Sequence, residues 1–238
     1  MPHDALAFSV VVPAYNERDN IEPLVRQLAA ALDPLRQAYE ILIVDDASSD
    51  DTWSRIEACQ REFPQLRGIR QPRRGGQSCA MLTGMRQARG AVIVTLDGDL
   101  QNDPADIPRL LERLNGCDAV CGYRARRRDS WSRRAGSRLA NRIRNWVTQD
   151  GVRDTGCSLK AFRRMCVDDL PPLNGVHRFM PAYFRLNGRR IEELAVNHRP
   201  RERGQSKYTN LKRLPKTILD LLGFWWYRRR YLRIPHVG

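Results

Sequence analysis

Three short apolar runs rich in Val and Ile indicate the strands of a parallel sheet. They occupy residues 8–15, 39–48 and 90–99, and each of them ends in polar residues. Short, nearly continuous runs of this kind are typical of strands that are buried on both faces. We therefore expect three central parallel strands in the first hundred residues.

The segments between these runs carry apolar residues at helical spacing. Residues 17–32, 49–63 and 75–90 fit this pattern, and the residues predicted near the helix starts are Asn16, Ser48 or Ser49, and Gly76. Strands that alternate with helices predict an α/β sheet with right-handed crossovers. The pair Gly75-Gly76 before the third helix is also a plausible anion-binding turn.

Polar residues gather where the three strands end. In open α/β sheets, ligands bind at the carboxyl ends of the strands. The residues at these ends are Asn16 and Glu17, Asp45 and Asp46, and Asp97 and Asp99. For Asp45 and Asp46 a structural role beside a helix N-terminus is the alternative to ligand binding.

The stretch VTLDGDLQNDP (94–104) carries two acids one residue apart after an apolar run. If the chain stays extended, Asp97 and Asp99 lie on the same side, because strand side chains alternate with period two. Gly98 keeps the backbone close, and the two carboxylates can share one hard cation. Mg²⁺ or Mn²⁺ held in this way completes its shell with water and substrate phosphates.

The three strand ends carry the strings VVPAYNE, IVDDASSDDT and VTLDGDLQNDP, in that order, within residues 8–107. Together they resemble family-2 glycosyltransferases with the GT-A fold, which implies a Rossmann-like, mixed and mainly parallel sheet flanked by helices. The resemblance implies a nucleotide-diphospho-sugar donor and a Mg²⁺ or Mn²⁺ ion held by Asp97 and Asp99. It implies further donor contacts from Pro13, Tyr15, Glu17, Asp45, Asp46 and Gln101.

Charge divides the chain into two unlike halves. Residues 1–119 carry 13 Arg and 18 Asp and Glu, whereas residues 120–238 carry 28 Lys and Arg and only 9 acids. A basic half suggests a polyanionic partner, either nucleic acid or a phosphate-bearing membrane surface. No nucleic-acid-binding motif accompanies it, and PAYNE stands where a dinucleotide-binding GxGxxG would follow the first strand.

Four further strings lie between residues 99 and 208: DLQNDPADIP, GYR, DTGCSLKAFRR and RERGQSKY. They resemble the polyprenyl-phosphate branch of the family, which includes dolichol-phosphate mannose synthase and bacterial undecaprenyl-phosphate sugar transferases. The resemblance implies that Arg124, Arg133, Ser137, Arg201 and Lys207 bind the acceptor phosphate or the diphosphate, and that Asp154 faces the sugar. Nine Arg within residues 124–144 suit a phosphate acceptor, which needs cations for positioning more than a general base.

The C-terminal segment is basic and amphipathic. Residues 211–232 place Leu211, Leu214, Ile218, Leu221, Leu222 and Trp225 on one stripe. Tryptophans beside Lys and Arg are typical of a helix that lies on a membrane surface. The alternative is a helix that packs on its own domain or on a twin subunit.

The sequence therefore predicts a metal-dependent inverting glycosyltransferase that moves mannose, glucose or N-acetylglucosamine to a polyprenyl phosphate. The expected GT-A catalytic domain spans residues 1–208, with a nucleotide-sugar and metal half at 1–119 and an acceptor half at 120–208. Residues 209–238 form the interfacial segment. The rival predictions are transfer to a glycan or protein hydroxyl and, more distantly, a nucleic-acid-binding protein.

The expected location is the cytoplasmic face of a membrane. No apolar stretch reaches the length of a membrane-spanning helix, no secretory leader precedes the first strand, and the six cysteines form no CxxC pair. We expect peripheral attachment to the membrane surface, with a small membrane-anchor protein or a second copy of the chain as further partners.

Overall fold

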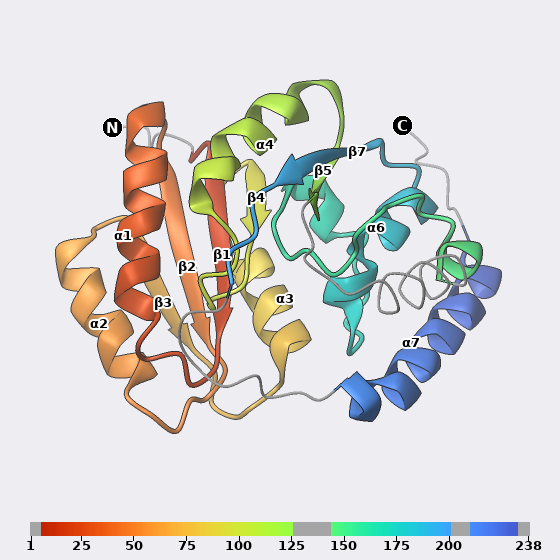
Figure 1. Cartoon of the computed structure of the whole chain (residues 1–238), viewed down its shortest axis with the longest axis horizontal. Helices are drawn as coiled ribbons and strands as arrows, with labels where there is room; N and C mark the ends of the chain where they lie inside the picture. The colour runs from red at the N-terminus through yellow and green to blue at the C-terminus, as the bar shows by residue number, and fades with distance from the viewer. Residues whose placement is uncertain (1–5, 126–143, 201–209, 233–238) are drawn as a thin grey trace.

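The computed structural model describes residues 6–125, 144–200 and 210–232 (Figure 1). They form a seven-stranded sheet of order β3-β2-β1-β4-β6-β5-β7. Its strands are β1 (Phe8–Ala14), β2 (Tyr39–Asp45), β3 (Leu66–Arg70), β4 (Val92–Thr95), β5 (Ala119–Arg124), β6 (Lys160–Arg163) and β7 (Ile191–Val196).

The sheet is mixed and mainly parallel, as predicted. Strand β1 pairs in parallel with β2 and β4, and β2 with β3; β5 pairs in parallel with β7. Strand β6 runs antiparallel to both of its neighbours, β4 and β5. Strand β6, from the second half of the chain, lies between β4 of the first half and β5, which begins at the boundary between the halves. Both halves therefore share one sheet.

Helices cover both faces of this sheet. The longer helices are α1 (Ile21–Leu32), α2 (Thr52–Glu62), α3 (Gln77–Gln87), α4 (Ile107–Arg113), α6 (Val176–Leu186) and α7 (Asn210–Arg230). Short 3₁₀ turns lie at Asp33–Leu35, Pro104–Asp106, Leu114–Gly116 and Arg164–Val167. Residues 144–148 are also helical.

Period-two alternation in the strands sorts the core into two layers. Val10 and Val12 of β1 pack with buried residues of α1, α2 and α4. Val11 of the same strand and Leu42 of β2 pack on the opposite side with α3 and α6. Successive side chains of a strand point to opposite faces, so the continuous apolar runs are explained by burial on both.

The predicted strands and helices are confirmed in position, but their ends differ. The helices begin at Ile21, Thr52 and Gln77, with Asn20, Asp51 and Gly76 as their N-caps. The start predicted at Gly76 is therefore correct, and those at Asn16 and at Ser48 or Ser49 are wrong. Those side chains bond across the two loops instead, as described below.

Helix α7 lies at the end of the molecule opposite α2 (Figure 1). One side of it packs on α6, where Phe224 stacks against Phe179 and meets the ring of Tyr183 edge-on. Asp220 forms an ion pair with Arg178 at the start of α6, 3.5 Å apart. Within the described ranges, none of the helices combines the length and apolar character needed to cross a membrane.

Candidate active site

A cleft of about 450 Å³ opens at the carboxyl ends of β1, β2 and β4. The register aligns Ala14 of β1 with Asp45 of β2, so the loops that follow these strands start side by side. The cleft is lined by Pro13, Ala14, Tyr15, Glu17, Asp46, Arg74, Gly76, Gln77, Ala80, Asp97, Gly98, Asp99, Gln101, Asn102, Arg124, Gly156, Cys157, Ser158 and His198.

The two loops after β1 and β2 are joined by side-chain hydrogen bonds. The backbone N–H of Asn16 donates to Ser48 Oγ at 2.9 Å, and the backbone N–H of Ser49 donates to Asn16 Oδ1 at 2.9 Å. Asn16 and Ala47 both have positive φ, a conformation that Asn tolerates better than most residues. These contacts between loops explain why Asn16, Ser48 and Ser49 do not cap the helices.

The two acids at the end of β2 have different environments. Asp46 lines the cleft and is buried, and its two carboxylate oxygens accept hydrogen bonds from the backbone N–H groups of Gly75 (2.6 Å) and Gly76 (2.8 Å). The anion bound by this glycine turn is therefore a side chain of the protein itself. Asp45 is buried and is not among the residues that line the cleft. Its carboxylate accepts a hydrogen bond from the Ser48 backbone N–H at 3.1 Å and forms an ion pair with Arg70 Nε at 3.7 Å.

Asp97 and Asp99 lie in a turn, and not on a strand as the period-two argument assumed. Strand β4 ends at Thr95, and Leu100 has a φ of 62°. Gly98 lies against the end of β1, where a Cβ atom would come within 3.3 Å of the Pro13 carbonyl oxygen. The turn nevertheless puts both carboxylates into the cleft, as the sequence predicted, and allows the charge of Asp99 to act on Asp97.

Two residues from other elements hold the Asp97 end of this turn. Gln77 Nε2 at the start of α3 donates to Asp97 Oδ1 at 2.7 Å. Ser158 Oγ, just before β6, accepts from the Asp97 backbone N–H at 3.1 Å and from Asn102 Nδ2 at 2.7 Å. Helix α3 and the loop before β6 therefore position Asp97 jointly.

The acids of the turn fit a hard divalent cation. Both Asp97 and Asp99 offer carboxylate oxygens at the floor of the cleft, which are the ligands that Mg²⁺ and Mn²⁺ prefer. Across the part of the chain that the structure describes, no three His, Cys, Asp or Glu side chains converge on one point. A cation here would complete its shell with water and with oxygens of a phosphate ligand.

The proton affinity of Asp97 predicts how cation binding depends on pH. Burial, followed by the neighbouring charge of Asp99, raises the pKa of Asp97 to about 6. A proton and a cation compete for this carboxylate, so we expect the Mn²⁺ affinity to be about tenfold weaker at pH 5 than at pH 7.

Free Mn²⁺ measured by electron paramagnetic resonance, without nucleotide, tests this dependence. Nucleotide is left out because its terminal phosphate titrates in the same range. The variant Gln77→Ala is the control, because Gln77 stabilises the ionised form of Asp97 and its removal moves the midpoint to higher pH. An affinity that does not change between pH 5 and pH 7 contradicts the prediction.

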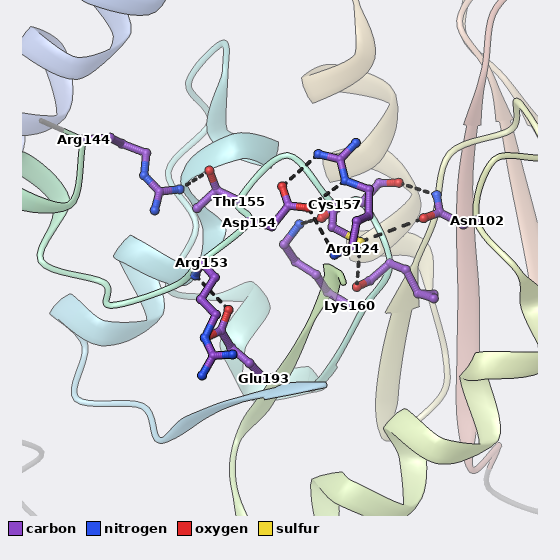
Figure 2. A network of polar contacts seen from close by, with 11 residues as sticks. Asn102, Arg124, Arg144, Arg153, Asp154, Thr155, Cys157, Lys160 and Glu193 are labelled. Carbon is purple, nitrogen blue, oxygen red and sulfur yellow. Dashed lines mark hydrogen bonds and ion pairs between the residues drawn. The ribbon is translucent and has the colours of Figure 1, made fainter. Parts of the chain in front are cut away.

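Arg124 and Asp154 form a bidentate ion pair on the other side of the cleft (Figure 2). Arg124 Nε and Nη2 donate to the two carboxylate oxygens of Asp154 at 2.6 and 2.8 Å. Both side chains are less than a fifth exposed, and Arg124 lines the cleft whereas Asp154 is not among its lining residues. Gly156 leaves room for the pair, because a Cβ atom there would come within 3.1 Å of Arg124 Nη2.

The Arg-rich segment is not uniformly available to a phosphate. Arg144 is largely buried, with Asp150 3.5 Å away, and it bonds Thr155 Oγ1 and the carbonyl oxygen of Val152. This arginine holds the loop that carries Asp154, so its role in the described structure is architectural. Arg133, Ser137, Arg201 and Lys207 lie outside the described residues.

The cleft also contains residues that the sequence patterns did not single out: Arg74, Gln77, Ser158 and His198. The Arg74 guanidinium lies over the ring of Tyr15, 3.9 Å from its centroid. His198 pairs with Asn102 in an isolated bridge. Two of these residues could have been found from their position beside a recognised motif. Arg74 directly precedes the glycine pair, and His198 comes three residues before the RERGQSKY string.

Comparison with known structures shows the same fold. Glucosyl-3-phosphoglycerate synthase from Mycobacterium tuberculosis, in a complex with Mn²⁺, UDP and glucosyl-3-phosphoglycerate, is 22% identical; the match covers 98% of this chain and 82% of that one, with a TM-score of 0.70. The mannosyltransferase PcManGT from Pyrobaculum calidifontis, with GDP-Man and Mn²⁺, is 21% identical over 98% and 67%, with a TM-score of 0.71. TarS residues 1–349 from S. aureus, with UDP-GlcNAc, is 19% identical over 97% and 68%, with a TM-score of 0.67.

A family model gives the assignment. The model of glycosyl transferase family 2 matches residues 9–170, which include all of β1 but its first residue, the turn of Asp97 and Asp99, and the Arg124–Asp154 pair. The strand ends identified from the sequence lie within this match, and so does most of the cleft. The chain belongs to glycosyl transferase family 2.

Proposed function

We propose that this glycosyltransferase moves a hexose from a nucleotide-diphospho-sugar to a polyprenyl phosphate, with inversion, and that it requires Mg²⁺ or Mn²⁺. The observation that supports the proposal is that one cleft contains both a group of acids that suits a cation and an arginine that suits a phosphate. Acids lie at its floor, at Asp97 and Asp99, and a guanidinium held by a carboxylate lies at its other side, at Arg124 and Asp154.

The donor would bind on the side of β1, β2 and α3. Tyr15 and Arg74 form a stacked surface there, and Pro13, Glu17, Asp46 and Gln101 line the same side. Asp45 lies beneath this wall and supports it. The cation would be held by Asp97 and Asp99, and it would supply positive charge to the leaving diphosphate.

The acceptor side supports a phosphate nucleophile. A phosphate monoester is largely ionised at neutral pH and needs no base, whereas a hydroxyl acceptor requires a group that removes a proton. Both oxygens of Asp154 accept hydrogen bonds from Arg124, so this carboxylate is better suited to hold the guanidinium than to take a proton. Arg124, oriented in this way, presents a planar cation toward an acceptor phosphate.

In the reaction, an acceptor phosphate oxygen attacks the anomeric carbon from the side opposite the leaving group. The new bond joins carbon 1 of the sugar to the acceptor oxygen, and the bond from carbon 1 to the diphosphate oxygen breaks with its electron pair. The nucleoside diphosphate leaves as an anion. No proton needs to move at the acceptor.

The test is transfer of radiolabel from a panel of UDP- and GDP-sugars, with Mg²⁺ or Mn²⁺, into organic-extractable product. We expect label in the lipid from one donor, only when polyprenyl phosphate is added. Label that enters a glycan, a protein or phosphoglyceric acid without lipid would support a hydroxyl acceptor and overturn the lipid assignment. The identity of the productive donor would name the sugar among mannose, glucose and N-acetylglucosamine.

We also propose that the outer face of α7 attaches the enzyme to a membrane surface. The packed side of the helix is formed by Leu221, Phe224 and Tyr227. The apolar side chains on the other side are exposed: Ile218, Leu219, Leu222, Trp225 and Trp226. The adjacent residues Arg228, Arg229 and Arg230 add positive charge, which suits anionic headgroups.

Vesicle sedimentation tests this face. We expect the full chain to bind vesicles that contain phosphatidylglycerol more tightly than vesicles of phosphatidylcholine, and Leu222→Glu with Trp226→Glu to weaken binding about tenfold or more. Met165→Glu is the control, because Met165 is an exposed apolar residue outside α7. A variant that stays bound, or a wild type that forms dimers through α7 and ignores vesicles, would contradict the proposal; the small anchor protein and the cytoplasmic location remain predictions.

A further inference from the structure

A buried lysine lies behind the cleft, outside the residues assigned above. Lys160 is the first residue of β6 and is 1% exposed. It lies opposite Thr95 of β4 on one side and Cys121 of β5 on the other. An ammonium group in such a position loses its hydration, so it is expected to have a compensating partner.

The partner found for this ammonium is a backbone carbonyl. Lys160 Nζ donates a hydrogen bond to the carbonyl oxygen of Cys157. Among the described residues, no carboxylate lies within 4 Å of Nζ to form an ion pair with it. The charge therefore has no carboxylate of the described residues in direct contact, and its field reaches the cleft, where it lowers the pKa of Asp97 against the larger rise caused by burial.

Those surroundings are the wall between the donor and acceptor sides of the cleft. Cys157 and its neighbours Gly156 and Ser158 line the cleft. Ser158 Oγ accepts a hydrogen bond from the backbone N–H of Asp97, and Gly156 lies beside the guanidinium of Arg124. Figure 2 shows the Lys160 side chain extending toward Cys157 next to the Arg124–Asp154 pair.

The lining of the cleft carries more acids than bases, so a buried cation beside it would offset negative charge. Among the described lining residues, four are acids, Glu17, Asp46, Asp97 and Asp99, and two are arginines, Arg74 and Arg124. A nucleoside diphosphate brings further negative charge into this acidic site. A fixed cation in a poorly solvated wall offsets that charge more strongly than one in water, because screening is weaker there.

We propose that Lys160 is a positioning residue, which anchors the Gly156–Ser158 wall through Cys157 and favours the binding of the anionic diphosphate in the cleft. Lys160 does not line the cleft, so it would act by holding the wall in place and through the electrostatic field of its ammonium group. The proposal rests on the use of a nucleotide-sugar donor given above.

The experiment compares ligands that share a base and differ in phosphate. The affinities of UDP and GDP, and of uridine and guanosine, are measured by calorimetry or ligand-observed NMR on the full chain, in EDTA and again with Mn²⁺. For Lys160→Met we expect about tenfold weaker binding of the diphosphate bound by the wild type, with the affinity of its nucleoside unchanged within twofold. Lys160→Arg, which keeps the charge, should restore part of the loss.

A matched control removes another cation from the same strand region. Arg164 donates to the carbonyl oxygens of Gly90 and Ala88, away from the cleft, and Arg164→Met should leave the diphosphate affinity unchanged. Equal loss of nucleoside and diphosphate binding in Lys160→Met would indicate structural damage and overturn the proposal, as would an unchanged diphosphate affinity. A wild type that binds neither nucleotide would overturn the proposed donor and, with it, this role for Lys160.

Discussion

Asp97→Asn and Asp99→Asn are expected to lower metal-dependent transfer about a thousandfold or more each while leaving the fold intact. Each change removes a carboxylate charge from the turn that closes the floor of the cleft. A neutral amide is a weaker ligand for a hard cation, so the positive charge that stabilises the leaving diphosphate is lost. Initial rates at saturating donor, over a range of Mn²⁺ concentrations, measure the effect.

Asp103→Asn is the matched control for this pair. Asp103 belongs to the same loop but is not among the residues that line the cleft, and its side chain accepts from the Ala105 backbone N–H. Asn keeps this capping bond and weakens only the ion pair with Arg199, a partly exposed residue that does not line the cleft. We therefore expect near-normal rates. Unchanged activity in Asp97→Asn or Asp99→Asn would refute the metal assignment, and a parallel loss in Asp103→Asn would attribute the effect to the loop.

Arg124→Lys is expected to lower kcat/KM for the lipid phosphate about a hundredfold, with most of the change in the KM for that acceptor. Lysine cannot reproduce the two parallel hydrogen bonds that the guanidinium makes with Asp154. Asp154→Asn should have a similar effect, because it releases the guanidinium from its orientation. Hydrolysis of the donor without acceptor should change little in either variant.

A double-mutant cycle tests whether the two residues act as one unit. For residues in direct contact, the combined loss in Arg124→Lys with Asp154→Asn should be clearly smaller than the sum of the single losses. Arg153→Lys is the control, since Arg153 lies on the same loop as Asp154, pairs with Glu193 of β7 at 3.5 Å and does not line the cleft. Strict additivity would show that the two residues act independently, and a donor hydrolysis rate that falls with transfer would place Arg124 on the donor side instead.

Three strands and three helices of the first hundred residues could be predicted because their signals are local, whereas β3 (Leu66–Arg70) was missed because its sequence LRGIR has no continuous apolar run. Apolar runs and helical spacing follow from burial on the two faces of one sheet, and the core residues Val10, Val11 and Val12 illustrate both faces. The ends of the elements could not be predicted as well. Asn16 and Ser48 have the composition of helix caps but bond to each other's loops, a pairing 32 residues apart in the chain.

Site residues were predictable where a motif carries its own chemistry. Asp97 and Asp99 line the cleft as expected, although a turn and not a strand presents them. The two neighbours Asp45 and Asp46 could not be distinguished in this way. Asp46 lies in the cleft because the glycine turn binds it, and Asp45 is buried beside Arg70. These partners come from other parts of the chain.

The roles of the basic residues in the second half of the chain could not be predicted from composition either. Composition indicated that the arginines of 124–144 face a phosphate, yet Arg144 is used to hold the loop at Asp150 and Thr155. In α7, the sequence indicated an amphipathic helix, and the fold decided which side is covered. Phe224 is buried against α6, and Leu222 and Trp226 are exposed.

The family, the α/β architecture and the two acids of the cleft could be predicted from local patterns, because they depend on short apolar runs and on strand ends that any such sheet brings together. The partners of the charged groups depend instead on the packing of distant segments. Strand β6 returns from the second half of the chain between β4 and β5, which sets Ser158 against Asp97 and buries Lys160 behind the same wall. Contacts between residues about sixty positions apart are fixed by the packing of the whole sheet, which no local pattern encodes.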